Sequence, residues 1–473
     1  MSGVFGAISK KDIVRTLFYG TDYHTHLGTQ FGGLAVLGDK LHRQIHDISQ
    51  SQFKSKFFDN IQMMKGTKGV GVISDSDEQP IYLNSKFGEF CLVMTGLITN
   101  KVELKKILFK QGISFSEVSN DEVNAVELIA KLISLGDTLI DGIEKMFDVI
   151  EGSCSLLILN EDGIYAARDR LGYTPLTIGL SEDSWAVTTE SCAFLNLKFK
   201  TEKVLAPGEI VLLTDEGLVS KRDGNATNQI CSFYWIYTGF PASNYEGINV
   251  EGVREQCGAA LAKRDKDIDA DVVAGVPDSG IAHAIGYAME SKTPYRRPLI
   301  KYTPGYGRSY TPPNQETRDL VATMKLIPIK EIIEGNKLVI LDDSIVRGTQ
   351  LKNFAIKKLW DCGAKEVHAR PACPPLMFPC KFCLSTRTHS ELIARRAIKE
   401  LEGKDLEDIS EYLDDTTLKY QKMIDWIAKD MGVTTLRYQN IDDMVEAIGI
   451  PKEKLCTYCW DGACPKAAKK TNG

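Results

Sequence analysis

The stretch LVILDDSIVRGT, residues 338–349, decides how the second half of this chain folds. Its four apolar residues, Leu338 to Leu341, predict a buried strand, and Asp342 and Asp343 follow directly at the carboxyl end. A loop of small residues then leads into a helix predicted to begin near Gln350. Loop amides and a helix N-terminus can hold a phosphate, and paired carboxylates can accept hydrogen bonds from sugar hydroxyls. The stretch therefore predicts a site for a phosphorylated sugar, and a buried strand followed by an acidic helix cap is the purely structural alternative.

A second strand end lies about sixty residues earlier, in VVAGVPDSG, residues 272–280. From Cys231 onward, apolar strands such as these are each followed by a loop and a helix-like segment. This βα rhythm predicts a doubly wound parallel sheet, in which ligands bind beyond the carboxyl ends of the strands. The Pro-Asp-Ser-Gly turn can offer backbone N–H groups and the Ser279 hydroxyl to phosphate oxygens, although alone it is an ordinary turn.

These motifs carry a resemblance to a known family. Residues 338–349 resemble the signature that binds phosphoribosylpyrophosphate (PRPP) in type I phosphoribosyltransferases, and DDSIVRGT is similar to the version in glutamine PRPP amidotransferases. The resemblance covers almost the whole chain and is strongest from Cys231 to Ile393. It implies that Asp342 and Asp343 contact the ribose and a magnesium ion. It further implies that the ribose phosphate is cradled by Ser344, Ile345, Val346, Arg347, Gly348 and Thr349.

The same resemblance implies a pyrophosphate site and a lid. Asp278, Ser279 and Gly280 resemble the family's pyrophosphate loop, and KYTPGYGRSY, residues 301–310, is similar to the loop that closes over PRPP. A lid would keep water from the reactive sugar carbon. Lys301, Arg308 and Lys325 would stabilise the charge on the leaving pyrophosphate, with a solvated surface charge as the alternative for the first two.

The first 230 residues favour a different α/β domain. Short β-like runs alternate with Gly, Asp and Asn turns, and one helix-like stretch, Val123 to Ile133, interrupts them. GVFG, from Gly3 to Gly6, resembles the start of N-terminal-nucleophile amidotransferases, which implies an αββα layered domain. In that family a catalytic cysteine precedes the motif and its own amine acts as the base, but here the residue is Ser2. A serine activated by its own amine, once Met1 is removed, is the alternative to lost activity.

Further departures from the family predict that this domain does not hydrolyse glutamine. The glutamine-binding motifs are replaced by His26–Thr29 and by Gly71–Asp75, so the arginines are missing. The oxyanion-hole motif reads Met94–Leu97, which leaves one of two donors, and loss of one donor alone costs on the order of a hundredfold in rate. The run that should carry an amine-binding acid reads Asn124–Glu127. Scaffold motifs persist at Arg168–Leu176 and Thr189–Ala193.

The cysteines indicate a metal site. Cys456 and Cys459 form a CxxC pair, which alone is compatible with zinc, redox chemistry or iron. The resemblance implies a four-iron four-sulfur (4Fe-4S) cluster held by Cys231, Cys380, Cys456 and Cys459, as in one branch of the family. Zinc on the same thiolates and empty buried thiols are the alternatives, with Cys383 and Cys464 as spare ligands.

Length and composition limit the remaining possibilities. The 473 residues suggest two or three domains, which we expect at 1–230, at 231–465 with a C-terminal helical extension, and in a disordered tail at 466–473. A net charge of -6 argues against a nucleic-acid partner. No apolar run approaches the roughly 18 residues that span a bilayer, and the N-terminus carries no secretory pattern, so we expect a cytoplasmic protein.

Three functional hypotheses follow. The first is a phosphoribosyltransferase that transfers a nitrogen nucleophile, with ammonia as the expected one, to PRPP and releases pyrophosphate, with magnesium on the pyrophosphate. The second is phosphoribosyl transfer to a different acceptor. The third is a non-catalytic sensor of PRPP or nucleotides. The acid pair and the lid-like loop favour catalysis, and the resemblance implies a homodimer or homotetramer.

Overall fold

The computed structural model describes residues 2–116, 118–119, 122–225, 227–302, 326–349, 351–383, 386 and 388–463. It divides into two compact units. The first comprises residues 1–231, 242–247 and 381–385, and the second comprises residues 232–241, 248–380 and 386–473. Two short segments from the second half of the sequence therefore belong to the first unit.

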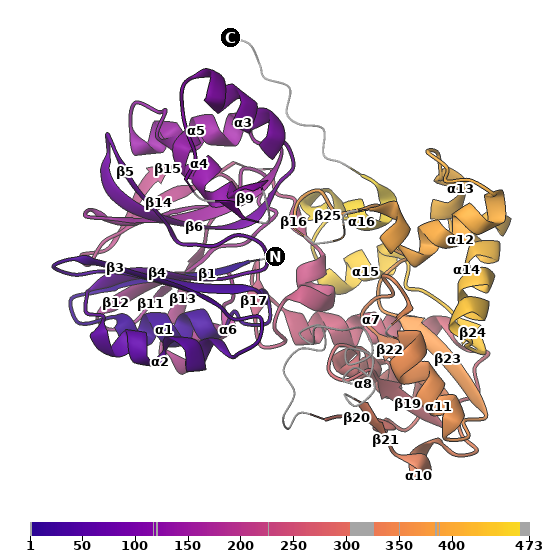
Figure 1. The fold of residues 1–473 in the computed structure, drawn as a ribbon. Coiled ribbons are helices and arrows are strands. Elements are labelled where there is room, and N and C mark those ends of the chain that lie inside the picture. Colours follow the sequence, from indigo (N-terminus) through magenta and orange to yellow (C-terminus); the bar gives the residue numbers. More distant parts are fainter. Residues whose placement is uncertain are drawn as a thin grey trace. The chain divides into compact units, whose positions relative to one another are not determined.

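The first unit has four layers, with two antiparallel sheets between two layers of helices (Figure 1). One sheet has the order β13-β11-β12-β1-β4-β2-β3 and the other β15-β14-β10-β9-β6-β5. The strands of the first sheet are β1 (Gly3–Ser9), β2 (Phe31–Leu37), β3 (Leu41–Asp47), β4 (Lys68–Ser74), β11 (Thr177–Leu180), β12 (Ser184–Thr188) and β13 (Lys200–Val204). Those of the second are β5 (Ile81–Ser85), β6 (Gly88–Ile98), β9 (Gly152–Asn160), β10 (Gly163–Ala167), β14 (Ile210–Leu213) and β15 (Leu218–Arg222).

Alternation along the strands builds these layers. Val4 and Ile8 of β1 pack into the core between the two sheets, whereas Phe5 and Ala7 face the helices. The helices beside the first sheet are α1 (Val14–Asp22), α2 (Phe53–Met63) and α6 (Cys192–Asn196). Those beside the second sheet are α3 (Lys101–Lys110), α4 (Ala125–Ile133) and α5 (Leu139–Val149). The short strands β7 (Val118–Ser119), β8 (Glu122–Val123), β16 (Ile230–Cys231) and β17 (Asn244–Tyr245) complete the unit. The predicted αββα domain is confirmed.

The second unit is built on a parallel sheet with the order β19-β22-β23-β24. These strands are β19 (Val272–Gly275), β22 (Lys337–Asp342), β23 (Glu366–Pro371) and β24 (Thr435–Leu436). The remaining strands are β18 (Ile248–Asn249), β20 (Leu299–Lys301), β21 (Leu326–Pro328) and β25 (Leu455–Cys456). The strands predicted at 338–341 and 272–276 are therefore present.

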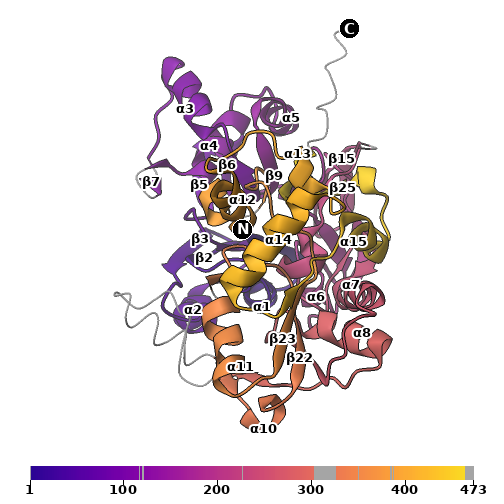
Figure 2. The same ribbon diagram turned by 90° about the vertical axis from the view of Figure 1, so that its right-hand side faces the viewer.

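Helices cover both faces of this sheet, as a doubly wound fold requires (Figure 2). Val272, Leu338, Ile340 and Val367 face a core that includes Leu359 and Ile427 on the helical side. The helices are α7 (Val250–Arg264), α8 (Ile281–Ser291), α10 (Lys330–Ile333), α11 (Lys357–Asp361), α12 (Ile393–Glu402), α13 (Ser410–Leu413), α14 (Leu418–Met431), α15 (Ile441–Ile448) and α16 (Tyr458–Asp461). Short π- or 3₁₀-helical turns occupy Tyr234–Thr238, Leu351–Ile356, His389–Glu391 and Lys452–Lys454.

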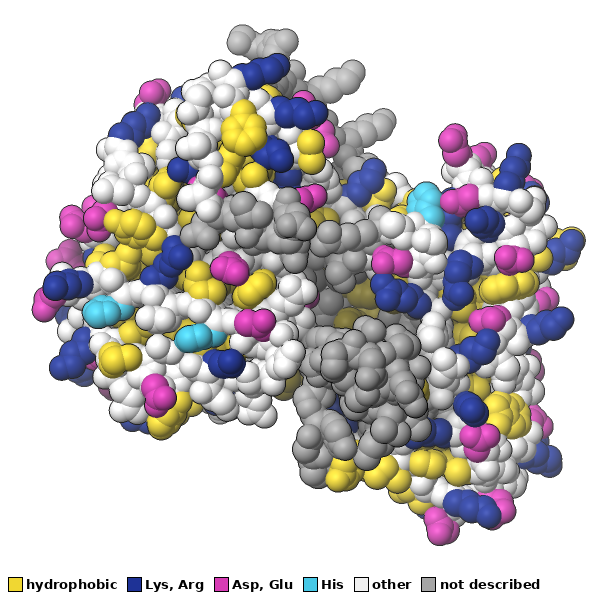
Figure 3. All heavy atoms as spheres, in the orientation of Figure 1, with side chains coloured by type: hydrophobic (Ala, Val, Ile, Leu, Met, Phe, Trp, Pro, Cys, Tyr) yellow, Lys and Arg dark blue, Asp and Glu magenta, His cyan; other side chains and the backbone are white. Residues whose placement is uncertain are grey.

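Charges are mixed on the visible surface. On the face drawn in Figure 3, basic and acidic side chains alternate and no single sign gathers over either unit. Among the described residues on that face, this distribution offers no broad basic surface for a polyanion. None of the helices in the described part of the chain is long and apolar enough to cross a membrane.

Candidate active site

The carboxyl ends of β19 and β22 bring the two sequence motifs together. The strands are parallel neighbours with Gly275 opposite Leu341, and the Val276 amide donates to the Leu341 carbonyl at 2.8 Å. The chain then turns, so that the Ser279 hydroxyl donates to Oδ1 of Asp342 at 2.6 Å. The predicted pyrophosphate turn therefore contacts the predicted ribose-binding acid.

Gly280 makes this close approach possible. A Cβ atom at this position would stand 2.1 Å from the Leu341 carbonyl oxygen and 2.7 Å from the Val276 nitrogen. Both contacts are with backbone atoms, which cannot move without disturbing the two strands. A glycine is therefore required for the turn to fold back over the end of β22.

The two acids are crowded at the strand end. The Asp343 amide donates to Oδ1 of Asp342 at 3.0 Å, and the Ser344 hydroxyl donates to Oδ2 of Asp343. Burial raises the pKa of both carboxyl groups, and the negative charge of Asp343 raises that of Asp342 further. A divalent cation or the hydroxyls of a sugar would relieve this unfavourable arrangement.

Residues of α12 hold the loop after the acids by donating hydrogen bonds to its carbonyl groups. The Val346 carbonyl accepts from the Ile393 amide at 2.8 Å, and the Arg347 carbonyl accepts from the Arg396 guanidinium at 2.7 Å. Gly348 has φ +75°, and a Cβ there would meet Ile393 Cδ1 at 2.6 Å. Within the described residues, the amides of 344–348 have no hydrogen-bond acceptor. Such fixed peptide planes with free N–H groups suit an anion.

Cationic side chains lie around this site. Lys301, at the end of β20, forms an ion pair with Asp278 of the turn, with Nζ and Oδ2 2.7 Å apart. Arg347 instead pairs with Glu391 at 2.7 Å. The predicted lid residues Arg308 and Lys325 lie outside the described residues. Lys301 is therefore the predicted pyrophosphate-binding cation for which the structure gives a position.

The first unit gathers the residues that replace the glutaminase motifs. Ser2 is buried, and its hydroxyl donates to the Ser74 hydroxyl at 3.3 Å. Thr95 donates to the Ser2 carbonyl at 2.5 Å. Gly3 pairs with Ile73 across β1 and β4, which places these positions side by side. Ser74 and Thr95, which belong to the two altered glutaminase motifs, therefore lie together beside Ser2.

The expected glutamine clamp is replaced by internal hydrogen bonds. Thr29 donates to Oδ1 of Asp75 at 2.8 Å, next to Ser74, which stands at the position of the arginine in the family motif. Asn124 caps α4 by accepting from the Val126 and Glu127 amides, and its own amide donates to the Glu78 carbonyl. Glu127 is buried and accepts from the Ser116 amide at 3.0 and 3.1 Å. The Asn124 and Glu127 side chains therefore make hydrogen bonds within the first unit.

Comparison with known proteins identifies the family. Residues 69–196 match the family model described as a glutamine amidotransferase domain. The chain is 31% identical to the amidophosphoribosyltransferase of Methanocaldococcus jannaschii, over 98% of each chain. It is 32% identical to the Bacillus subtilis enzyme of the same name, over 98% of this chain and 94% of that one. The chain belongs to the amidophosphoribosyltransferase family.

Solved structures agree with this membership. The Bacillus subtilis glutamine PRPP amidotransferase complexed with ADP and GMP superposes with a TM-score of 0.84 at 30% identity, over 99% of this chain and 98% of that one. A second structure, of an allosteric regulatory enzyme of purine biosynthesis, has the same TM-score and identity over 100% and 97% of the two chains. The predicted pairing of an N-terminal-nucleophile domain with a type I phosphoribosyltransferase domain is confirmed.

Two features of this family member were missed by sequence reasoning. The buried Gln79 donates to the Met94 carbonyl at 3.2 Å and accepts from the Met94 amide at 2.8 Å, beside Ser74. Buried Glu190 accepts from Tyr245 at 2.7 Å and lies 2.9 Å from His26 Nε2. Burial would raise the pKa of Glu190, but the charge and hydrogen bond of His26 lower it overall. A charged residue within the scaffold motif Thr189–Ala193 was the available signal for Glu190.

The cysteines predicted to bind a metal are buried. Cys231 lies in the first unit and Cys380, Cys456 and Cys459 lie in the second, and all four are buried. Among the described residues, no group of three or more His, Cys, Asp or Glu side chains is arranged to hold a metal ion. Cys383 is in the first unit with its Sγ 4.0 Å from the Ser153 hydroxyl, and Cys464 is outside the described residues. The cluster therefore stays a prediction, and no catalytic step involves one.

Proposed function

We propose that this family member transfers ammonia to PRPP, giving phosphoribosylamine and pyrophosphate in a reaction of purine biosynthesis. The nitrogen lone pair attacks the anomeric carbon, the bond to the pyrophosphate oxygen breaks, and pyrophosphate leaves with the electron pair. The nitrogen then loses a proton to solvent. The observation that carries this proposal is the contact between the turn at Ser279 and the acid pair at Asp342. It unites a pyrophosphate-type turn with a ribose-type acid pair at one strand end.

Each group has a role in this proposal. Asp342 and Asp343 hold the ribose hydroxyls, and the loop Ser344–Thr349 holds the ribose phosphate through the amides of 344–348, which have no acceptor within the described residues. Asp278, Ser279 and Gly280 receive the pyrophosphate, and Lys301 and Arg308 stabilise its charge as it departs. Mg²⁺ held by the two aspartates would neutralise part of that charge when bound. Burial raises the pKa of both acids, so their ionised forms are unfavourable in the empty site. A bound cation would favour the ionised forms and so offset this cost.

We propose that the nitrogen donor is free ammonia and not glutamine. Ser2 lacks the thiol of the family's nucleophile, and its hydroxyl is engaged with Ser74. Asp75 would repel the carboxylate of a bound glutamine. The Asn124 and Glu127 side chains, which align with the amine-binding run, are bonded to the scaffold. Three elements of glutamine hydrolysis are therefore altered together, and the domain serves as a folded partner of the transferase.

Pyrophosphate release from PRPP tests this function. Purified full-length protein with Mg²⁺ and PRPP should release pyrophosphate when ammonium chloride is added at mildly alkaline pH, and not when glutamine replaces it. Turnover with glutamine would refute the ammonia assignment. Turnover that needs another amine would support a different acceptor, and PRPP binding without any turnover would support the sensor hypothesis.

Three further assignments belong to the proposal. We place the glutaminase-like domain at 1–230, the transferase domain at 231–465 and a tail at 466–473, in a cytoplasmic homo-oligomer. A 4Fe-4S cluster on Cys231, Cys380, Cys456 and Cys459 would be structural, with zinc as the alternative. Iron, sulfide and zinc analysis of protein purified without oxygen distinguishes the two metals, and absence of all three would leave these thiols metal-free.

A further inference from the structure

A second pocket lies in the transferase unit, beyond the carboxyl ends of β23 and β24. Its volume is about 310 Å³. Pro374 and Pro375 follow β23, and Gln439 and Asn440 follow β24. None of its lining residues belongs to the acid pair, the Ser344–Thr349 loop or the 278–280 turn. Ligands of open parallel sheets bind beyond the carboxyl ends of strands, so the position itself indicates a ligand site.

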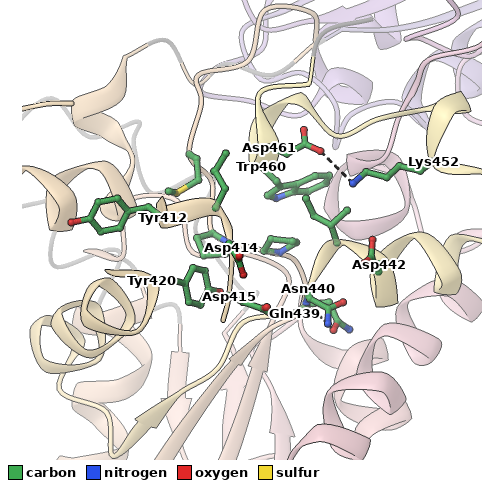
Figure 4. Close-up of a pocket in the computed structure, with 15 residues that line it drawn as sticks. Tyr412, Asp414, Asp415, Tyr420, Gln439, Asn440, Asp442, Lys452, Trp460 and Asp461 are labelled. Atoms are coloured by element: carbon green, nitrogen blue, oxygen red, sulfur yellow. Dashed lines mark hydrogen bonds and ion pairs between the residues drawn. The ribbon is translucent and has the colours of Figure 1, made fainter. Parts of the chain in front are cut away.

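The walls of this pocket are aromatic and well supported. Figure 4 shows Trp460 across the pocket from Gln439 and Asn440, with Tyr412 and Tyr420 to one side. Trp460 stacks on Phe233 with ring centroids 5.0 Å apart. Gln439 is buried, and its amide donates to the Cys257 carbonyl at 2.9 Å. A rigid aromatic wall opposite fixed amides is typical of pockets for small molecules.

Trp460 is fixed in this wall. Its side chain is 2% exposed, and its indole N–H contacts the buried Cys373 thiol. The ring therefore offers a surface whose position does not depend on a ligand.

The charge of the lining decides the class of ligand. Four aspartates, Asp414, Asp415, Asp442 and Asp461, face one lysine, Lys452. Lys452 lies 3.7 Å from Asp461, and Arg264 lies 3.5 Å from Asp415. Asp442, on the exposed first turn of α15, has no ion pair within the described residues. The excess of acids disfavours PRPP and other phosphorylated compounds and favours a cation.

We propose that this pocket binds a small organic amine as its cation, with the apolar part of the amine against Trp460 and the tyrosines. Ring faces attract cations, and the acids at the mouth hold the ammonium group. The acids also keep the amine protonated, which removes the lone pair needed to attack a sugar. The amine is therefore a ligand of a separate site and not the acceptor of the phosphoribosyl group.

Calorimetry on the full-length protein tests this site without any assay of activity. Tryptamine and agmatine serve as aromatic and aliphatic cationic probes, and tryptophol is the neutral match of tryptamine. We expect saturable binding of at least one amine, little binding of tryptophol, and no competition by PRPP. Binding that PRPP displaces would place the amine in the transferase site and overturn the proposal, as would no saturable binding of either amine.

Substitution at the mouth supplies the matched comparison. The double variant Asp415→Asn with Asp442→Asn changes two exposed acids of the lining and should weaken amine binding about tenfold or more. Glu446→Gln removes an exposed acid from the same helix as Asp442 but outside the lining, and should leave the affinity unchanged. Equal losses in both variants, or none in the double variant, would contradict the assignment. Failure here leaves the PRPP reaction untouched, because the two sites share no lining residue.

Discussion

Ser279 donates a hydrogen bond of 2.6 Å to Asp342 although 63 residues separate them in the chain. The contact joins the end of β19 to the end of β22. It orients one carboxylate of the pair and sets the distance between the two predicted halves of the PRPP site. Its removal should therefore affect substrate binding more than folding.

For Ser279→Ala we expect the KM for PRPP to rise about tenfold with ammonia as the donor, since a hydrogen bond to a charged group is lost. The free energy of unfolding should change by less than about 1 kcal/mol. Initial rates of pyrophosphate release and urea unfolding measure the two effects. Ser291→Ala, at the exposed end of α8, is the control and should change neither. An unaltered KM in Ser279→Ala would remove the serine from the site.

Gly280→Ala should lower the free energy of unfolding by about 2 kcal/mol and reduce PRPP turnover sharply. The added Cβ would meet the Leu341 carbonyl at 2.1 Å, which forces the turn or β22 to shift. Gly252→Ala on α7 is the matched control, because its Cβ would meet only Asn249 Oδ1 at 3.9 Å. That variant should stabilise the protein by about 0.5–1 kcal/mol. Equal stability of the two variants would show that the close approach at Gly280 is unimportant.

Ser2→Cys should not restore the use of glutamine. A thiol alone lacks the arginine of the carboxylate clamp, whose position holds Ser74, and the second oxyanion donor. Glutamate release from glutamine measures this outcome, and pyrophosphate release with ammonia should equal that of the unaltered protein. Glutamine hydrolysis by Ser2→Cys would mean that a single substitution separates this domain from an active glutaminase.

Acid should weaken the first unit through His24. Burial lowers the pKa of this imidazole from 6.5 to about 4, so the unfolded chain binds a proton more readily than the folded one. The free energy of unfolding should therefore fall as the pH drops from about 6.5 toward 4. Between pH 7 and pH 5 the loss from this group is about 2 kcal/mol.

Urea unfolding at these two pH values measures the effect. His24→Gln should unfold with a smaller difference between pH 7 and pH 5, whereas His42→Gln, at an exposed position of β3, should keep the difference of the unaltered protein. A full difference in His24→Gln would assign the acid sensitivity to other groups.

The strands and the site at their ends were predictable because they depend on local patterns. Four apolar residues before Asp342 specify a buried strand, and the small residues after it specify a loop. The partnership of Ser279 with Asp342 required only that the two strands be parallel neighbours. Arg308 and Lys325 lie outside the described residues, so their roles stay predictions.

Local sequence patterns could not predict the contacts between distant segments. Nothing near Glu190 in the sequence indicates that Tyr245 will donate to it, because the pairing depends on where the chain returns. The pocket at Trp460 likewise combines segments that follow β23 and β24 with the C-terminal α16. The cluster that the resemblance implies stays a prediction, because the described residues show no group of side chains arranged to hold a metal ion.

The first unit cannot be isolated by a single cut in the gene. Ser243 and Tyr245 bond to buried Glu190, and Phe382 stacks on Tyr173 with ring centroids 4.0 Å apart. A fragment that stops at residue 231 would leave a carboxylate without two of its donors and an aromatic ring without its neighbour. A recombination event at that boundary would therefore yield a first unit that lacks parts of its own interior.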